Sequence, residues 1–122
     1  MIHMLRFIGS LALLLSTSIL LGAEPRLPSE KELLKQGEKV FRTTCFACHG
    51  ADGKGLVPGT PDLTGKNSPL KQDATLLKER IWDGYQSEGS SLAMPPKGGN
   101  PQLKEPEVEA VIVYMRKMFL PK

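Results

Sequence analysis

Cys45-Phe46-Ala47-Cys48-His49 is the stretch that decides the fold, and it holds both cysteines of the 122-residue chain. The Cys-x-x-Cys-His spacing is typical of covalent haem attachment. Two thiols one helical turn apart can form thioethers with two neighbouring vinyl groups of one porphyrin, and the adjacent histidine can direct its imidazole at the iron. The run therefore predicts one c-type haem per chain, held by Cys45 and Cys48, with His49 as an axial ligand.

Paired cysteines also serve other chemistry, which leaves alternatives to haem open at this point. Two cysteines in an exported protein often form one disulfide, and a Cys-x-x-Cys pair is also typical of thioredoxin-like redox proteins. The redox interpretation expects a βαβ context, and no strong strand pattern precedes Cys45. A structural zinc site needs four ligands, whereas residues 24–122 offer two cysteines and one histidine. The histidine directly after Cys48 favours haem, and disulfide or dithiol chemistry is the alternative.

The first 23 residues have the organisation of a secretory signal peptide. Arg6 precedes a mostly apolar run over residues 8–21, and the small pair Gly22-Ala23 follows it. A basic start, a short apolar core and a small-residue exit are typical of cleaved export signals. The run is shorter than the ~20 residues that a membrane-spanning helix needs. We therefore expect a periplasmic domain over residues 24–122, with a retained anchor facing the periplasm as the alternative.

Size and charge narrow the classes of protein further. Residues 24–122 suffice for one domain with a modest hydrophobic core, so a buried haem would form a large part of that core. The formal net charge of +3 is small, and the two carboxylates of a haem would cancel most of it. The composition therefore gives no case for nucleic acid as a partner, and a membrane is expected only if the leader is retained.

Three stretches combine helical spacing of apolar residues with helix-start or helix-stop signals. Ser29 and Glu32 form a capping box ahead of the first helix, which should run to about Thr44. The second helix is expected over residues 73–83 and the third over residues 106–120. The connecting segments are rich in glycine, proline and polar residues. We expect an all-α domain of three to four helices wrapped around one covalently bound haem, with no sheet of consequence.

The second axial ligand can be sought among the soft side chains. The other histidine lies in the leader, so His49 is the only one in the mature chain, which excludes two histidine ligands. Met115 and Met118 lie on the third helix, where a methionine pair at this spacing usually packs in the core. Met94 instead lies in a loop that two following prolines stiffen. We therefore predict His49 and Met94 as the axial ligands.

Ligation by histidine and methionine has a chemical consequence. The soft thioether favours ferrous iron and raises the reduction potential. Iron with six ligands has no open position for a substrate or for oxygen. The chain is therefore expected to carry electrons, one per haem, rather than to act as an enzyme. Two alternatives are a haem subunit of a redox enzyme complex and a ligand-binding sensor in which the bond from Met94 to iron is labile.

The chain resembles the class I (mono-haem) cytochromes c over the whole of residues 24–122, and its last segment is similar to small soluble bacterial members of the c5 type. Four features beside the haem motif carry the resemblance: Gly37 and Phe41 upstream of it, Asp52-Gly53-Lys54-Gly55, Pro61-Asp62-Leu63-Thr64-Gly65, and Met94-Pro95-Pro96-Lys97-Gly98-Gly99 ahead of a helix with Tyr114. Many c5-type members also carry a cysteine pair near the last helix. This chain has Asn100 there and no spare thiol, and its polar run over residues 86–91 is long.

The resemblance implies roles for residues around the haem. Pro61 would accept a hydrogen bond, through its carbonyl, from the far nitrogen of His49, which fixes the imidazole tautomer. Leu63 would pack on the haem. Trp82 would either contact a haem propionate or pack in the core. The first helix would cross the last one closely at Gly37, where the absence of a side chain permits it.

The expected partners are redox proteins, namely a membrane oxidoreductase, a terminal oxidase, or a periplasmic dehydrogenase or reductase. Lys54, Lys66 and Lys97 lie in loops that should border the haem edge. A weak positive ring there would steer an acidic partner. Redox encounters are small and transient, so we expect the chain to be a monomer.

Overall fold

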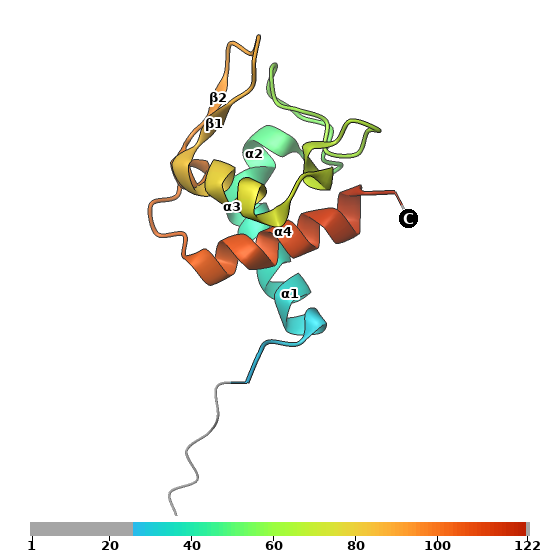
Figure 1. The fold of residues 1–122 in the computed structure, drawn as a ribbon, viewed down its shortest axis with the longest axis vertical. Coiled ribbons are helices and arrows are strands. Elements are labelled where there is room, and N and C mark those ends of the chain that lie inside the picture. The colour runs from blue at the N-terminus through green and yellow to red at the C-terminus, as the bar shows by residue number, and fades with distance from the viewer. Residues whose placement is uncertain (1–25, 122) are drawn as a thin grey trace, which may run out of the picture.

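The computed structural model describes residues 26–121, so the predicted signal peptide and the alternative membrane anchor lie outside the described residues. Within that range the chain is mostly helical (Figure 1). None of its helices is long and apolar enough to cross a membrane. The elements, in chain order, are α1 (Glu30–Val40), the π-helical η1 (Phe41–Cys45), α2 (Phe46–His49), the 3₁₀ turn η2 (Pro69–Lys71), α3 (Ala74–Asp83), β1 (Tyr85–Gln86), β2 (Ala93–Met94), the 3₁₀ turn η3 (Pro96–Gly99) and α4 (Glu105–Phe119).

The start of α1 follows the predicted capping box. The backbone N–H of Ser29 donates to the Glu32 carboxylate at 2.7 Å, and the Glu32 N–H donates to Ser29 Oγ at 3.3 Å. The predicted end near Thr44 is wrong, because the helical backbone continues through η1 and α2 to His49. A π turn widens the helix without ending it, and such turns are frequent at functional sites. The Cys-x-x-Cys-His run therefore ends one long helical rod.

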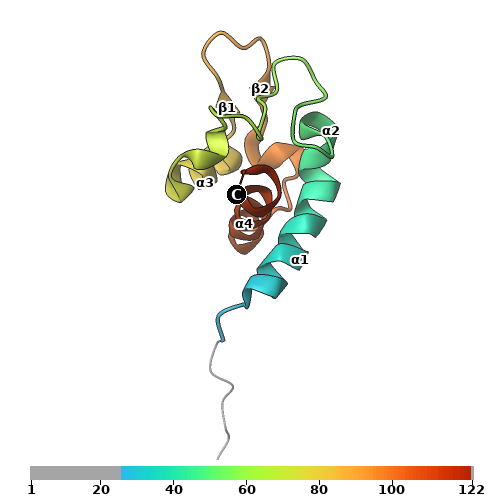
Figure 2. The same ribbon diagram turned by 90° about the vertical axis from the view of Figure 1, so that its right-hand side faces the viewer.

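The crossing of α1 and α4 organises the core (Figure 2). A Cβ at Gly37 would lie 2.2 Å from the carbonyl oxygen of Ala110 and 2.6 Å from Cβ of Tyr114, so only glycine fits there. Next to this contact, the ring of Phe41 packs on the rings of Tyr114 and Phe119, with centroids 5.7 and 5.2 Å away. The expectation that the first helix meets the last one at Gly37 is confirmed.

Buried apolar side chains of α1, η1 and α4 continue from this crossing into one core. Val108, Ala110 and Val111 of α4 are fully buried, and Val40 packs opposite them. Leucines from the intervening segments complete the same cluster, namely Leu63, Leu70, Leu77 and Leu103. The last helix therefore faces both the first helix and the loops that close the domain.

The second helix and the polar loop after it form a compact unit. Asp73 caps α3 by accepting a hydrogen bond from the Thr75 N–H at 2.8 Å, and Gly84 follows its last residue with φ +82°. Both ends agree with the prediction. The segment beyond Gly84 forms a small antiparallel pair in which Tyr85 faces Met94. This two-residue pair is the only sheet within residues 26–121, in line with the expected all-α class.

The third helix begins one residue earlier than predicted. Its first residue is Glu105, with Pro106 next and Lys104 as the preceding cap. The Lys104 N–H donates to the Glu107 carboxylate at 2.9 Å, which satisfies a backbone donor that the cap would otherwise leave open. Pro106 still lies in the first turn, where its missing N–H removes no helical hydrogen bond.

We predict that Gly37→Ala destabilises the domain by about 1–3 kcal/mol, the range for overpacking a closed interior. The added methyl group would meet the carbonyl of Ala110, and α1 and α4 would have to move apart. Urea denaturation followed by circular dichroism measures the change in unfolding free energy. Gly65→Ala is the matched control, because its Cβ would meet no atom closer than 3.7 Å. Equal stability of the two variants would contradict the close crossing.

Candidate cofactor site

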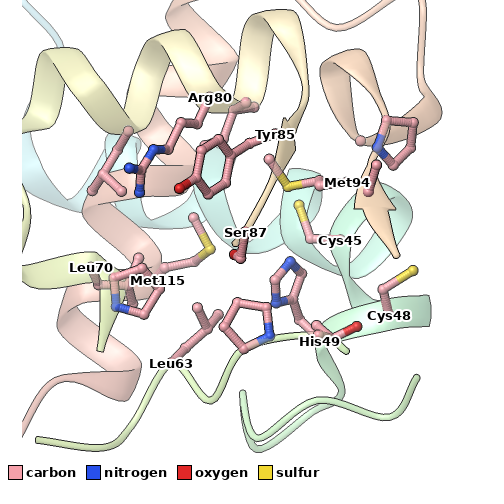
Figure 3. Close-up of a pocket in the computed structure, with 18 of the residues that line it drawn as sticks. Cys45, Cys48, His49, Leu63, Leu70, Arg80, Tyr85, Ser87, Met94 and Met115 are labelled. Carbon is pink, nitrogen blue, oxygen red and sulfur yellow. The ribbon is translucent and has the colours of Figure 1, made fainter. Parts of the chain in front are cut away.

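A cavity of about 400 Å³ opens between the end of the helical rod, the loop after it, α3 and the β1–β2 hairpin (Figure 3). Its volume lies within the ~300–1,000 Å³ range of small-molecule and cofactor sites. Six of the seven predicted site residues line it: Cys45, Cys48, His49, Pro61, Leu63 and Met94. They come from segments far apart in the sequence, so only the folded chain brings them together.

The two cysteines differ in their surroundings. Cys45 is half-buried, Cys48 is exposed, and they are not joined as a disulfide. Burial, with a smaller contribution from Cys48, raises the pKa of the Cys45 thiol to about 12. A reactive dithiol needs a lowered pKa, so the surroundings of Cys45 do not fit redox chemistry between the two thiols. A thioether carries no proton to lose, and its apolar sulfur suits the half-buried position.

His49 offers a neutral imidazole to the cavity. Burial lowers its pKa, so at neutral pH the ring keeps a lone pair that can bind a metal. Nδ1 is buried and has no hydrogen-bond partner within residues 26–121. The bond predicted from His49 to the Pro61 carbonyl is therefore not formed at Nδ1, although Pro61 lines the same cavity. Such an unpaired nitrogen is costly to bury. The arrangement is consistent with an imidazole ring whose orientation would be set by a bound metal ion.

Met94 reaches the cavity from β2, and its side chain points into the space between Tyr85 and Cys45 (Figure 3). Pairing with Tyr85 fixes its backbone. Gly84 packs beneath it, because a Cβ at Gly84 would lie only 2.8 Å from the carbonyl oxygen of Met94. Met115 is buried in the core, as predicted, yet it also lines the cavity from α4. The same prediction is wrong for Met118, which is 58% exposed and lies on the solvent side of α4. Two methionines therefore border the cavity.

Leu63 and Trp82 have different positions relative to the cavity. Leu63 is buried in the cavity wall. In the part of the chain that the structure describes, Trp82 does not line the cavity and packs against the hydrophobic core instead. The ammonium group of Lys97 lies 4.0 Å from the centre of the Trp82 ring, a cation–π contact. This position agrees with core packing, the second of the two interpretations of Trp82.

Arg80 and Tyr85 form a polar end of the cavity that the sequence pattern did not indicate. The guanidinium carbon of Arg80 lies 3.9 Å from the centre of the Tyr85 ring. Arg80 Nε is buried without a partner in the described part of the chain. Figure 3 shows this pair away from the two cysteines. No aspartate or glutamate within residues 26–121 lines the cavity, so the pair is suited to an anionic group on the bound molecule.

The residues present fit a c-type haem. An apolar cavity carries two thiols at one end, a neutral imidazole and a thioether at its sides, and a guanidinium at the other end. The order of these groups suits a haem c, because its thioether carbons and its carboxylates lie on opposite edges of the porphyrin. The sequence signal that could have pointed to Arg80 is weak, since an arginine on an amphipathic helix usually faces solvent.

Comparison with known proteins agrees with the site. A family model described as Cytochrome c matches residues 34–119. Cytochrome c-555 of Prosthecochloris aestuarii is 37% identical over 84 residues, which cover 67% of this chain and 84% of that protein. The chain therefore belongs to the cytochrome c family, and it transfers electrons through a covalently bound c-type haem.

Other relatives are larger than this chain. The cbb3-type cytochrome c oxidase subunit CcoP of Rhodobacter capsulatus is 30% identical over 92 residues, but the match spans only 31% of that protein. Among solved structures, cytochrome CL from Methylophaga aminisulfidivorans MPT superposes with a TM-score of 0.57 at 27% identity, over 75% of this chain and 56% of that one. The all-α cytochrome c fold is thereby confirmed.

We predict that the two thiols together account for covalent attachment. Cys45→Ser or Cys48→Ser alone leaves one thioether, and the double variant loses the covalent link. Mass spectrometry of the denatured protein measures this, because a covalently bound haem stays with the chain. Met118→Leu, at an exposed position, should keep the full haem mass. A haem that remains bound to the double variant after denaturation would contradict this assignment.

Proposed function

We propose that this chain is a periplasmic electron carrier whose haem iron is bound between His49 and Met94. The observation that carries the proposal is that both side chains reach one cavity from different elements, His49 from α2 and Met94 from β2. His49 would supply the iron with a nitrogen ligand and Met94 with a soft sulfur ligand. When bound, the haem exchanges one electron between its ferric and ferrous states.

The chain's own residues prepare the site for that exchange. The neutral imidazole of His49 needs no deprotonation before it binds metal. The thioether of Met94 stabilises the ferrous state and raises the reduction potential. The mostly apolar wall, which includes Leu63, Leu70 and Leu77, keeps water away from the cofactor.

The lysines expected around the haem edge contribute unequally to partner recognition. Lys54 and Lys66 are exposed. Lys97 is half-buried; its ammonium lies over Trp82 and donates to the carbonyl of Pro101 at 3.4 Å. Two free charges steer a partner only weakly, so we propose a transient complex with an acidic redox protein and a modest dependence of its rate on salt.

A free carrier and a subunit of a redox enzyme complex remain two distinct candidates. The match to cytochrome c-555 over 84% of its length favours the carrier, whereas the match to part of an oxidase subunit motivates the second. Gel filtration of the exported protein, expressed at its natural level in its own host, distinguishes the free carrier from the complex. We expect a monomer, and stable co-purification with a catalytic subunit would favour the complex. Periplasmic location is tested by fractionation and by the mass of the mature N-terminus.

We predict that Met94→Leu abolishes the weak sulfur-to-iron absorption band of the ferric protein and lowers its reduction potential. Leucine matches the volume of methionine but cannot bind iron. Met115→Leu is the critical comparison, since Met115 borders the same cavity, and Met118→Leu is the exposed control. Optical redox titration of the three haem-loaded proteins provides the measurement. Loss of the band in Met115→Leu alone would assign the ligand to α4 instead.

A further inference from the structure

Gln72 connects the polar end of the cavity to the rest of the fold. Its side-chain oxygen accepts a hydrogen bond from Nη1 of Arg80, the residue whose Nε has no partner within residues 26–121. Both Gln72 and Arg80 line the cavity. The bond holds one side of the guanidinium, and stacking on Tyr85 at 3.9 Å restricts its plane. The remaining donors of the guanidinium are left for a molecule in the cavity.

Arg116 of α4 in turn fixes Gln72. Its Nη2 donates to the Gln72 carbonyl at 2.6 Å, and its Nε donates to the Leu70 carbonyl at 3.0 Å. These two bonds attach η2 and the residue that follows it to the last helix, more than 40 residues further along the chain. An arginine with two donors on two carbonyls holds the backbone in one position, which a lysine could not do. The position of Arg80 is therefore set from α4 through Gln72.

We propose that Gln72 is a positioning residue that holds Arg80 against a carboxylate of the haem, and that Arg116 keeps Gln72 in place. The proposal rests on the haem and not on the identity of its axial ligands. Haem c carries its carboxylates on the edge away from its thioethers, and Arg80 lies at the end of the cavity away from Cys45 and Cys48 (Figure 3). With no acidic side chain in the described lining, a haem carboxylate is the anion that fits this guanidinium.

The arrangement predicts how the reduction potential responds to pH. A guanidinium beside a carboxylate favours the ionised form and lowers its pKa by about 1–3. With Arg80 held in place, the carboxylate stays ionised through the neutral range and the potential changes little there. Without that hold, the carboxylate gains a proton as the pH falls. The loss of negative charge disfavours ferric iron, so the potential rises toward low pH.

The other charged and titratable groups near this end of the cavity have partners of their own, so the carboxylate remains the group whose titration would change the reduction potential. The ring of Tyr85, from β1, stacks on the guanidinium of Arg80 at 3.9 Å. The ammonium group of Lys97, from η3, is directed at Trp82 and Pro101. Arg116, from α4, donates to the backbone carbonyls of Leu70 and Gln72. The remaining titratable lining residues are the two cysteines and His49 at the motif itself, where thioethers would replace the thiol protons and iron would take up the lone pair of the imidazole.

The test uses the haem-loaded protein and a redox titration at several pH values. We expect Gln72→Leu to convert a flat profile of potential against pH into one that rises toward low pH. Gln72→Asn, one methylene shorter and still polar, should do the same because its oxygen cannot reach Arg80. Gln102→Leu is the matched control, at an exposed glutamine outside the cavity lining. Helical circular dichroism and the Met94–iron band of each variant verify that fold and ligation are intact.

A double-mutant cycle decides whether Gln72 acts through Arg80. If it does, Gln72→Leu changes the profile of the parent but adds nothing to the profile of Arg80→Leu. Additive effects of the two substitutions would overturn the proposal, and so would a Gln72→Asn profile identical to that of the parent. A missing Met94–iron band in the parent would refute the axial assignment, while the response to Gln72→Leu would still report on the carboxylate.

Discussion

The contact of Gly37 with α4 is the constraint on which the rest of the structure depends. Because a Cβ there would lie 2.2 Å from a backbone oxygen of Ala110, α1 and α4 approach more closely than any other residue at position 37 would permit. The approach fixes the direction of the helical rod, which ends in Cys45, Cys48 and His49. It also fixes α4, whose Met115 and Arg116 reach the cavity wall and the segment behind it. One glycine thus sets the position of both long walls of the haem site.

The site itself combines rigid and adaptable parts. His49 stands at the end of a continuous helix, so its direction follows from the helix crossing. Met94 is held more locally, by a two-residue strand pair and by the absence of a side chain at Gly84. The polar end depends on partners more than 40 residues apart, since Arg116 bonds the carbonyls of Leu70 and Gln72. The two proposed iron ligands and the polar end of the cavity are therefore held in place by three different kinds of interaction.

Local chemistry made much of this fold predictable from the sequence. The capping box at Ser29, the cap at Asp73 and the stop at Gly84 act within a few residues, so their signals are complete in a short window. The end of the first helix was predicted too early, because a π turn carries no distinct residue pattern. Arg80 and Gln72 were missed for another reason: their importance comes from long-range partners, which a single sequence does not display.

The two predicted iron ligands lie in parts of the fold with unequal resistance to local opening. The facing sides of α1 and α4 are buried at Gly37, Val40, Val108 and Val111, whereas the β1–β2 hairpin extends from the body of the protein and ends in an exposed glycine turn at Gly89. Hydrogen exchange should therefore be slow in the buried parts of α1 and α4 and much faster in the hairpin. Thermal fluctuations would then reach the iron first from the methionine side, and the sulfur would be the ligand that leaves before the fold is lost.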